Sequence, residues 1–446
     1  MADMIDIPDE VASIIAAISD GGYEAYAVGG CVRDCLLGKA PVDWDICTPS
    51  LPERTIEIFK GCHVVETGLK HGTITLMLNN KPFEITTYRV DGMYSDNRRP
   101  DSVEFVGDLR ADLSRRDFTI NAMAYNPSRG LVDYFGGEAD LQSGTIRCVG
   151  DADTRFREDA LRVMRALRFA STLGFSISGE TAAAAHRRKS LLRNISAERI
   201  SVELSKLLTG AKAGATLREH APVLTEIIPE IEAMIGFDQN TPYHYLDVWE
   251  HTAESVDHAP ADVTLRLTML LHDIAKPDCY TEVNGRGHFH GHPLMSADIA
   301  NRTLRRLRYD NETIDAVTQL VLYHDAGVLP DAKNVRRWLN RIGERRLRQL
   351  AEVKRADSMA QSEKYRKDKL DALETIEMLI DRIIEERQCF TLKDLAVNGR
   401  DLIAIGMPEG AEIGKTLARL LDMVLDERAE NEKTALLEAA RLFRKK

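Results

Sequence analysis

Residues 25–48, AYAVGGCVRDCLLGKAPVDWDICT, constrain the fold more than any other stretch of the chain. A short apolar run ends in a glycine pair, a helical segment follows, and a second strand-like segment, VDWDI, carries two aspartates. Because strand side chains alternate between faces, we expect Asp43 and Asp45 on one face and Trp44 on the other. The order strand, glycine turn, helix and strand predicts an α+β fold for the N-terminal part.

Strand-like runs are concentrated in the first third of the chain. The segments AYAVGG, WDICT, HVVETG, TITLML, FEITTY and VEFVGDL all precede residue 150, and the periodicity after about residue 151 is helical. Turn signals then suggest two further boundaries, near residues 240 and 365. We predict a head with a mixed β-sheet over residues 1–150, a helical neck over 151–240, a helical body over 241–365 and a helical tail over 366–446.

Composition excludes several classes of protein. The formal net charge of −11 argues against a surface coated with basic charge, although it allows a local basic groove. The seven cysteines are dispersed without a CxxC pair, which favours reduced thiols over a disulfide framework. No apolar run approaches the roughly 20 residues that span a bilayer, and MADMIDIPDE lacks the layout of a secretory signal. We expect a cytoplasmic protein that does not bind a membrane.

Three acidic residues of the head form a candidate metal site. Asp43 and Asp45 share a strand face, and Glu84 in PFEITTY points away from the core-facing Phe83 and Ile85. Three carboxylates on neighbouring strands repel one another unless cations lie among them. Magnesium takes such oxygen ligands and keeps positions for phosphate oxygens, and a glycine turn before a helix offers backbone N–H groups to an anion. The alternative is three unrelated surface acids.

These motifs resemble the head of the bacterial class II nucleotidyltransferases, which comprise the CCA-adding enzymes of tRNA and related poly(A) polymerases. VGGCVRDCLLG and DWDICT are followed by DLSRRDFTINAMAYN at 112–126, FREDALRVMRALRFASTLGF at 156–175 and ERISVELSKLL at 198–208. The segments occur in the family's order and spacing. The resemblance is close over the first 210 residues and looser beyond them.

The resemblance implies roles for individual residues. Asp43 and Asp45 would hold catalytic magnesium ions, with Glu84 as the third acid of the site. The implied nucleotide contacts are Gly30, Arg33, Arg116, Asp159 and Arg162, with Arg165 and Arg168 holding the triphosphate. Residues 86–105 resemble the flexible loop of family members that add the terminal A.

Asp159 and Arg162, in EDALRVMR, are three residues apart and are therefore expected on one helix face. Cytosine and adenine both present an amino donor beside a ring-nitrogen acceptor, whereas uracil and guanine present a carbonyl beside a ring N–H. A carboxylate next to a guanidinium suits the first pair and opposes the second. Spacing alone would also fit an ion pair on a helix surface, but the resembled family uses this segment to select the base without a nucleic-acid template.

A second candidate site lies among the helices between residues 240 and 360. Imidazole and carboxylate groups suit a divalent metal with a position open for water. The segment resembles the HD-domain phosphohydrolases, with a divalent metal of undetermined identity. The implied ligands are His251, His272, Asp273 and Asp357, with His292 and His324 as the extra pair of two-metal versions. Three other histidines, His244, His288 and His290, are assigned no role.

The sequence therefore predicts a CCA tRNA nucleotidyltransferase that uses CTP, ATP and Mg²⁺, with tRNA as partner and a possible phosphohydrolase activity in the body. Alternatives with the same head chemistry are an A-adding or CC-adding partial enzyme and a poly(A) polymerase. An alternative of another class is a phosphohydrolase whose head only binds RNA. The helical tail, where a glycine-rich loop precedes a helix, is expected to contact RNA.

Overall fold

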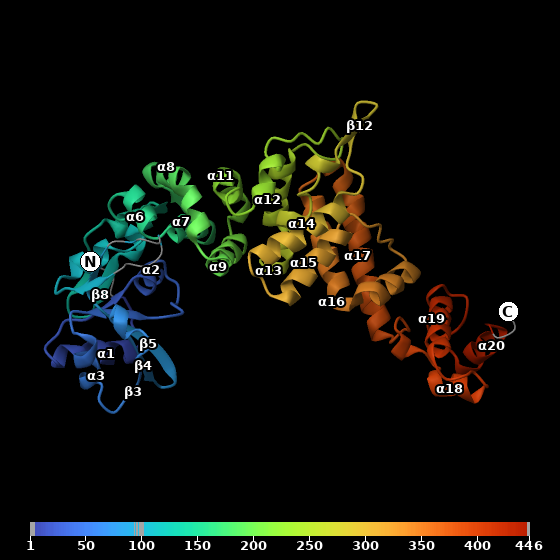
Figure 1. The fold of residues 1–446 in the computed structure, drawn as a ribbon, viewed down its shortest axis with the longest axis horizontal. Coiled ribbons are helices and arrows are strands. Elements are labelled where there is room, and N and C mark those ends of the chain that lie inside the picture. Colours follow the sequence, from blue (N-terminus) through green and yellow to red (C-terminus); the bar gives the residue numbers. More distant parts are fainter. Residues whose placement is uncertain (1–4, 93, 95–96, 98–101, 444–446) are drawn as a thin grey trace. The chain divides into compact units, whose positions relative to one another are not determined.

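The computed structural model of the chain describes residues 5–92, 94, 97 and 102–443 (Figure 1). The chain forms two compact units, Met1–Glu232 and Ala233–Lys446, which are described separately. The first unit contains the sheet, and the second is almost entirely helical, so the predicted α+β head followed by helical regions is confirmed. The predicted loop over residues 86–105 lies partly outside the described residues.

A seven-stranded mixed sheet forms the centre of the first unit, with strand order β3-β4-β5-β2-β1-β8-β9. The β2–β5 pair is parallel, whereas the other neighbouring pairs are antiparallel. The strands are β1 (Tyr26–Val28), β2 (Asp45–Thr48), β3 (His63–Val65), β4 (Thr73–Leu78), β5 (Lys81–Thr87), β8 (Met123–Asn126) and β9 (Gly130–Asp133). Two separate pairs are β6 (Arg89–Asp91) with β7 (Val103–Phe105), and β10 (Thr145–Ile146) with β11 (Ser176–Ile177).

Helices cover this sheet by burying apolar stripes. Helix α1 (Asp9–Asp20) contacts β1 and α3, and its buried residues recur every three or four positions, as expected for one helix face. These residues are Val11, Ile14, Ile15 and Ile18. Each aliphatic side chain removed from water in this way contributes about 1.5–3 kcal/mol.

The other helices of the first unit connect the strands or follow the sheet along the chain. They are α2 (Gly30–Leu36), α3 (Pro52–Ile58), α4 (Leu109–Ser114), α5 (Gly137–Gln142), α6 (Ala152–Glu158), α7 (Leu161–Leu173), α8 (Gly179–Arg188), α9 (Ala197–Leu208), α10 (Ala213–Glu219) and α11 (Ala221–Leu224). Helix α7 packs against α9, and α6 packs against α8.

The second unit begins with a helical bundle. Its helices are α12 (Val248–His258), α13 (Val263–Leu271), α14 (His292–Arg306), α15 (Asn311–Tyr323), α16 (Ala332–Met359) and α17 (Glu363–Glu385). A hairpin of β12 (Thr281–Val283) and β13 (Arg286–His288) precedes α14. Helix α16 contacts α12, α13 and α15, so one long helix joins the bundle together.

Aspartate side chains begin four of these helices. Asp247, Asp262, Asp310 and Asp331 each accept a hydrogen bond from the backbone N–H three residues later. An N-cap of this kind is worth about 1 kcal/mol. The helix starts of the bundle are therefore encoded locally in the sequence.

A smaller core holds the end of the second unit together. Helices α18 (Gly399–Ala404), α19 (Ala411–Leu425) and α20 (Lys433–Phe443) enclose a buried cluster that includes Leu402, Leu420 and Leu436. Helix α19 also contacts α16. No helix in the described part of the chain is both long enough and apolar enough to cross a membrane.

Candidate functional site

The acidic residues of the head meet at the edge where β2 begins. Strand β2 starts at Asp45, not at residue 42 as the alternation predicted, so Asp43 lies in the segment just before it. Asp45 is the direct partner of Glu84 in the parallel β2–β5 pairing, and both side chains are exposed, whereas Trp44 is buried. The predicted separation of the acids from the core is therefore present.

The electrostatics of this edge show that the carboxylates affect one another. Partial loss of water raises the pKa of Asp45, the Arg116 charge opposes this change, and the negative charges of Glu84 and Asp43 add to the rise. A cation among these oxygens would remove the repulsion. Carboxylate oxygens at a solvent-accessible edge are the donors that magnesium prefers, so the residues fit such an ion.

The glycine turn places an arginine beside these acids. Gly29 has φ 83°, a conformation that L side chains rarely adopt, and Gly30 begins α2. A Cβ atom on Gly29 would lie 2.9 Å from Arg116 Nη1, so glycine is needed for this close approach. Arg116 Nη2 is also 3.7 Å from Asp112 Oδ2, which directs its charge toward the turn.

Three other predicted nucleotide contacts surround one aromatic ring. The guanidinium carbons of Arg33, Arg165 and Arg168 lie 5.0, 5.5 and 3.5 Å from the centre of the Phe169 ring. Cations over an aromatic face are attracted to it. The ring therefore gathers three positive charges from α2 and α7 in one region of the head.

Acidic partners hold two of these arginines in place. Arg165 donates to Asp117 Oδ2 at 2.8 and 2.5 Å, and Arg168 donates to Glu203 Oε2 at 3.0 Å. Burial opposes ionisation of Asp117, but the Arg165 charge and the Asn121 amide hold its pKa below its usual range. The arginines are therefore oriented before any nucleotide binds.

The prediction that Asp159 and Arg162 share one helix face is wrong. Asp159 lies in extended conformation between α6 and α7, and Arg162 is in the first turn of α7. The Asp159 carboxylate pairs with Arg199 of α9 at 2.9 Å. Arg162 donates to Glu158 Oε2 at 2.7 Å and to the Arg115 carbonyl at 2.8 Å.

The same two residues nevertheless line one pocket of about 610 Å³. Its other lining residues are Thr67, Gly68, His71, Thr73, Arg89, Asp91, Tyr94 and Arg115. The Asp159 carboxylate, an acceptor, and the Arg162 guanidinium, a donor, thus line the same pocket. Tertiary contacts bring them there, and not their spacing along one helix.

The six predicted ligands of the second unit gather in one place from separate helices. His251 is on α12, His272-Asp273 follows α13, His292 begins α14, His324 follows α15 and Asp357 is near the end of α16. His251 Nε2 is 2.9 Å from Asp357 Oδ1. These six residues are called the histidine centre below.

Backbone carbonyls fix the orientation of three imidazoles in this centre. His272, His292 and His324 each donate from Nδ1 to the carbonyl oxygen three residues earlier, at 2.7, 2.8 and 2.7 Å. A carbonyl oxygen can only accept, so Nδ1 carries the proton and Nε2 of the neutral ring has a free lone pair. Metal-binding histidines are commonly oriented in this way.

Asp273 lies between two groups of imidazoles. Its Oδ2 atom is 3.0 Å from His272 Nε2 and 3.6 Å from His251 Nε2. Its Oδ1 atom is 3.3 Å from His292 Nε2 and 3.5 Å from His324 Nε2. Each carboxylate oxygen therefore faces its own histidine pair, which suits a carboxylate that bridges two ions.

Several buried polar atoms at the histidine centre have charged neighbours but no aligned hydrogen bond within the described part of the chain. His272 Nε2 and both oxygens of Asp273 are buried and make no aligned hydrogen bond among the described residues. Burial opposes ionisation of Asp273, but His272 and Lys276 hold its pKa well below its usual range. Unsatisfied buried groups cost about 1–3 kcal/mol each, and mixed imidazole and carboxylate donors fit a divalent metal.

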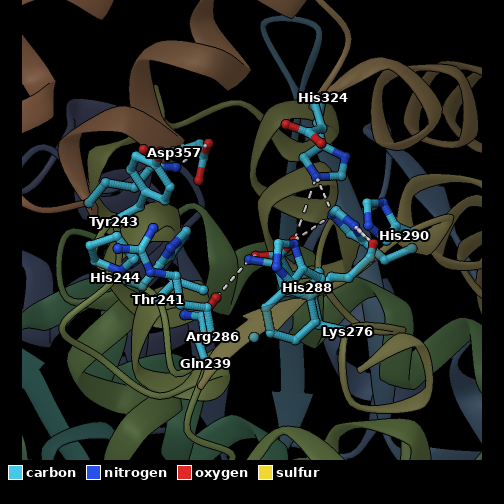
Figure 2. A pocket seen from close by; sticks show the side chains of 17 residues that line it. Gln239, Thr241, Tyr243, His244, Lys276, Arg286, His288, His290, His324 and Asp357 are labelled. Atoms are coloured by element: carbon cyan, nitrogen blue, oxygen red, sulfur yellow. Dashed lines mark hydrogen bonds and ion pairs between the residues drawn. The ribbon is translucent and has the colours of Figure 1, made fainter. Parts of the chain in front are cut away.

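A cavity of about 370 Å³ opens onto this centre (Figure 2). Asp273, His324 and Asp357 line it together with Lys276 and Gln239. Lys276 Nζ is 2.7 Å from Asp273 Oδ2 and donates to Gln239 Oε1 at 2.8 Å. The cavity thus places a buried cation beside the candidate metal ligands.

Three family models match separate segments of the chain. The Poly A polymerase head domain matches residues 25–147, an RNA and SrmB-binding site of polymerase A matches 174–235, and tRNA nucleotidyltransferase domain 2 matches 294–440. The first segment contains the three acids and the glycine turn. None of these three descriptions names a phosphohydrolase. The assignment of the histidine centre as a candidate metal site therefore rests on its geometry.

A CCA-adding enzyme of Levilactobacillus brevis is 36% identical to this chain over 431 residues, and the match covers 96% of both chains. This chain belongs to the family of CCA-adding enzymes. It is a nucleotidyltransferase. A CCA-adding enzyme of Geobacillus thermodenitrificans is 47% identical over 213 residues, which are 48% of this chain and 51% of that one.

Solved structures of CCA-adding enzymes have the same fold. The Bacillus stearothermophilus enzyme in complex with CTP matches with a TM-score of 0.73 and 28% identity, over 98% of this chain and 97% of that chain. The Thermotoga maritima enzyme complexed with tRNA matches with a TM-score of 0.62 and 21% identity, over 98% and 96% of the chains. The second match supports the fold alone.

Sequence reasoning missed three residues of these sites. Arg199, in the segment ERISVELSKLL, holds Asp159 of this CCA-adding enzyme. Lys276, three residues after Asp273 in HDIAK, had a spacing signal that could have identified it. His244, assigned no role, lies against the histidine centre beside His251 and Asp357, where burial and the Lys276 charge lower its pKa to about 3.

Proposed function

We propose that Asp43, Asp45 and Glu84 bind the magnesium ions with which this CCA-adding enzyme extends the 3′ end of tRNA from CTP and ATP. The pairing of Asp45 with Glu84 across the parallel β2–β5 strands carries this proposal. When bound, magnesium assists attack of the terminal hydroxyl on the α-phosphate and departure of pyrophosphate. The exposure of all three carboxylates leaves them accessible to a nucleotide and an RNA terminus.

The arginines next to this edge bind the triphosphate in our proposal. Arg116 reaches the Gly29 turn, and Arg33 Nη2 lies 3.6 Å from the position that a Cβ atom on Gly30 would take. Arg33, Arg165 and Arg168 supply further positive charge around Phe169. Charge-assisted hydrogen bonds of this type are the strong contacts for phosphate.

Asp159 and Arg162 select the base. In the pocket that they share, the carboxylate accepts from an amino group and the guanidinium donates to a ring nitrogen. Cytosine and adenine satisfy both groups, whereas uracil and guanine leave them opposed. Leaving buried polar groups unpaired costs about 1–3 kcal/mol, which disfavours the wrong bases.

The experiment is extension of tRNA that lacks its 3′ end, with each nucleoside triphosphate supplied in turn. Asp45→Ala and Glu84→Ala should abolish extension, whereas Glu53→Ala, an exposed acid of α3, should not change it. Addition of C, C and A by the wild type distinguishes the full activity from partial enzymes and from a poly(A) polymerase. Extension by both site variants at the wild-type rate would contradict the assignment.

We also propose that the protein acts in the cytoplasm. All seven cysteines are free, and Cys31, Cys47, Cys148 and Cys389 are buried. Unpaired thiols of this number fit a reducing compartment. Cell fractionation tests this placement. Recovery of the protein mainly from the periplasm or the medium would contradict it.

A second candidate function belongs to the histidine centre. We propose that it is a divalent metal centre that hydrolyses phosphate esters, because Asp273 faces two histidine pairs beside a cavity with a buried lysine. When bound, divalent metals lower the pKa of water and polarise phosphoryl oxygens. Lys276 holds a positive charge where a phosphate would enter.

Hydrolysis of p-nitrophenyl phosphate in the presence of Mg²⁺, Mn²⁺, Co²⁺ or Ni²⁺ tests this proposal. Asp273→Asn should abolish metal-dependent hydrolysis and leave tRNA extension intact, whereas Asp45→Ala should do the reverse. Equal hydrolysis by wild type and Asp273→Asn would contradict a role for the histidine centre.

A further inference from the structure

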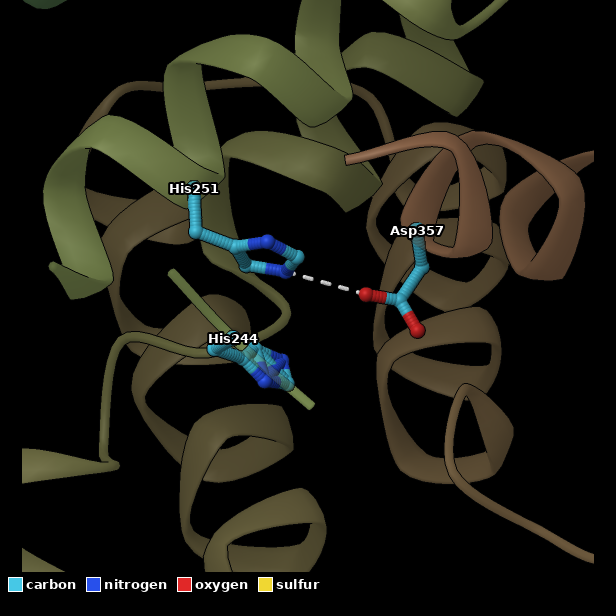
Figure 3. A group of neighbouring side chains, drawn as sticks. All are labelled: His244, His251 and Asp357. Atoms are coloured by element: carbon cyan, nitrogen blue, oxygen red, sulfur yellow. Dashed lines mark hydrogen bonds and ion pairs between the residues drawn. The ribbon is translucent and has the colours of Figure 1, made fainter. Parts of the chain in front are cut away.

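His244 lies against the histidine centre although it is on a loop outside the helices that carry the six ligands. Its ring packs edge-on to His251, with ring centres 4.6 Å apart and an interplanar angle of 71°. A ring nitrogen of His244, a ring nitrogen of His251 and a carboxylate oxygen of Asp357 all lie within 4.8 Å of one another. Figure 3 shows the three side chains converging from separate segments.

Both ring nitrogens of His244 are buried and have no hydrogen-bond partner among the described residues. The contrast with His272, His292 and His324 is clear, because each of these rings donates from Nδ1 to a carbonyl oxygen. A buried imidazole without any partner is costly, at about 1–3 kcal/mol for each group. The protein around His244 therefore does not satisfy the ring by itself.

The backbone holds the His244 loop beside the ligand-bearing end of α16. The Ser362 N–H donates to the Tyr243 carbonyl at 2.9 Å, and the Tyr243 and Tyr365 rings lie 4.8 Å apart. Asp357 is one helical turn before this anchor. The approach of His244 to Asp357 is thus fixed by tertiary contacts.

We propose that His244 is an additional ligand of the ion held by His251, His272, Asp273 and Asp357. This inference rests on the metal centre proposed above. Ligands that lie about 2.0–2.2 Å from a shared ion are within roughly 4.4 Å of one another. The candidate donor atoms of His244, His251 and Asp357 lie within 4.8 Å of one another, close to this limit.

The added imidazole changes which metals the site prefers. The set then contains three imidazoles and two carboxylates, and imidazole donors favour transition metals over magnesium. Five protein ligands leave one position of an octahedral ion for water or a phosphate oxygen. His292 and His324, on the other side of Asp273, would hold the second ion with fewer protein ligands.

Binding of Co²⁺ to the full chain tests the inference without measuring activity. Isothermal titration gives the number of ions and their affinities, and the visible absorption spectrum reports the coordination of Co²⁺. His244→Ala and His244→Phe should each lower the affinity for one of the two Co²⁺ ions by about tenfold or more and change the absorption spectrum of bound Co²⁺. The phenylalanine variant keeps the ring contact with His251, so the same loss in both variants separates metal binding from packing.

His258→Ala is the matched control, because this exposed histidine ends the helix that carries His251. Circular dichroism and thermal unfolding establish that each variant is folded. Wild-type stoichiometry, affinity and spectrum in both His244 variants would overturn the inference while leaving the metal centre intact. Absence of Co²⁺ binding to the wild type would overturn the metal centre and this inference together. If the wild type binds two ions and Asp273→Asn binds neither, the metal centre is supported independently of His244.

Discussion

At the scale of single residues, an arginine from another helix holds the carboxylate of Asp159, which we propose selects the base. Arg199 donates to Asp159 Oδ2 at 2.9 Å and to Oδ1 at 3.4 Å, and Oδ1 also accepts from the Leu161 backbone at 3.1 Å. Asp159 is not within a regular helix, so these contacts replace the helical frame that would otherwise fix its direction. If Asp159 selects the base as we propose, Arg199 is a positioning residue for that selection.

Arg199→Ala should lower kcat/KM for CTP and ATP by about tenfold and weaken discrimination against UTP. Loss of a charge-assisted hydrogen bond costs about 1.5–3 kcal/mol, and 1.4 kcal/mol corresponds to roughly tenfold in rate. Single-nucleotide addition to tRNA with CTP or UTP measures both effects. Arg199→Lys should restore part of the discrimination, and Arg193→Ala, which breaks an exposed pair with Glu226, should leave it unchanged. Wild-type selectivity in Arg199→Ala would exclude the positioning role.

At the scale of elements, the sequence predicted the type of secondary structure well and the positions where helices are interrupted poorly. Strands β8 and β9 of the sheet were not predicted. Strands β1 to β5, β7 and the candidate histidine and aspartate ligands were predictable, because alternation and residue chemistry are local signals. The break at Asp159 was not, because EDALRVMR carries no turn signal. A tertiary contact sets the break: the Ala160 N–H donates to the Asn97 carbonyl at 3.0 Å.

The same limit explains why His244 was missed. Helical histidines could be placed by their helices, whereas the position of a loop histidine depends on contacts with distant residues. The contact that places it joins Tyr243 to Ser362, more than a hundred positions along the chain. No spacing within the sequence encodes such a distance.

A partly buried lysine of α16 holds the end of α15 that carries His324. Lys354 Nζ donates to the carbonyl oxygens of His324 and Ala326 at 2.7 and 2.6 Å. The last carbonyls of a helix lack partners within it, and a cation there also complements the helix dipole. Burial lowers the pKa of Lys354, with the Asp357 charge opposing the change. One side chain therefore connects two ligand-bearing helices.

Lys354→Met should destabilise the second unit by about 1 kcal/mol, because two partly buried carbonyls lose their donor. It should also weaken Co²⁺ binding, since His324 would no longer be held in place. Thermal unfolding and Co²⁺ titration measure the two effects, and Lys367→Met, an exposed position on α17, is the control. Unchanged unfolding together with unchanged metal affinity would show that the contact has no structural role.

At the scale of the whole molecule, the two candidate sites lie in different compact units. The head acids belong to the unit Met1–Glu232, and the histidine centre belongs to Ala233–Lys446. Each site is built from segments of its own unit, namely neighbouring strands in one case and bundle helices in the other. A ligand of one site should therefore stabilise mainly the unit that contains it.

Differential scanning calorimetry of the full chain tests this separation by adding or removing ligands. A ligand that binds only the folded state at 100 times its Kd stabilises it by about 2.7 kcal/mol. CTP with Mg²⁺ should raise the temperature of one unfolding transition, and Co²⁺ should raise that of the other. Chelation of Co²⁺ should reverse its effect. Asp273→Asn should lose only the Co²⁺ response, and Asp45→Ala should lose or reduce only the response to CTP with Mg²⁺. If either variant lost both responses, the units would be coupled and the assignment of one site to each unit would be wrong.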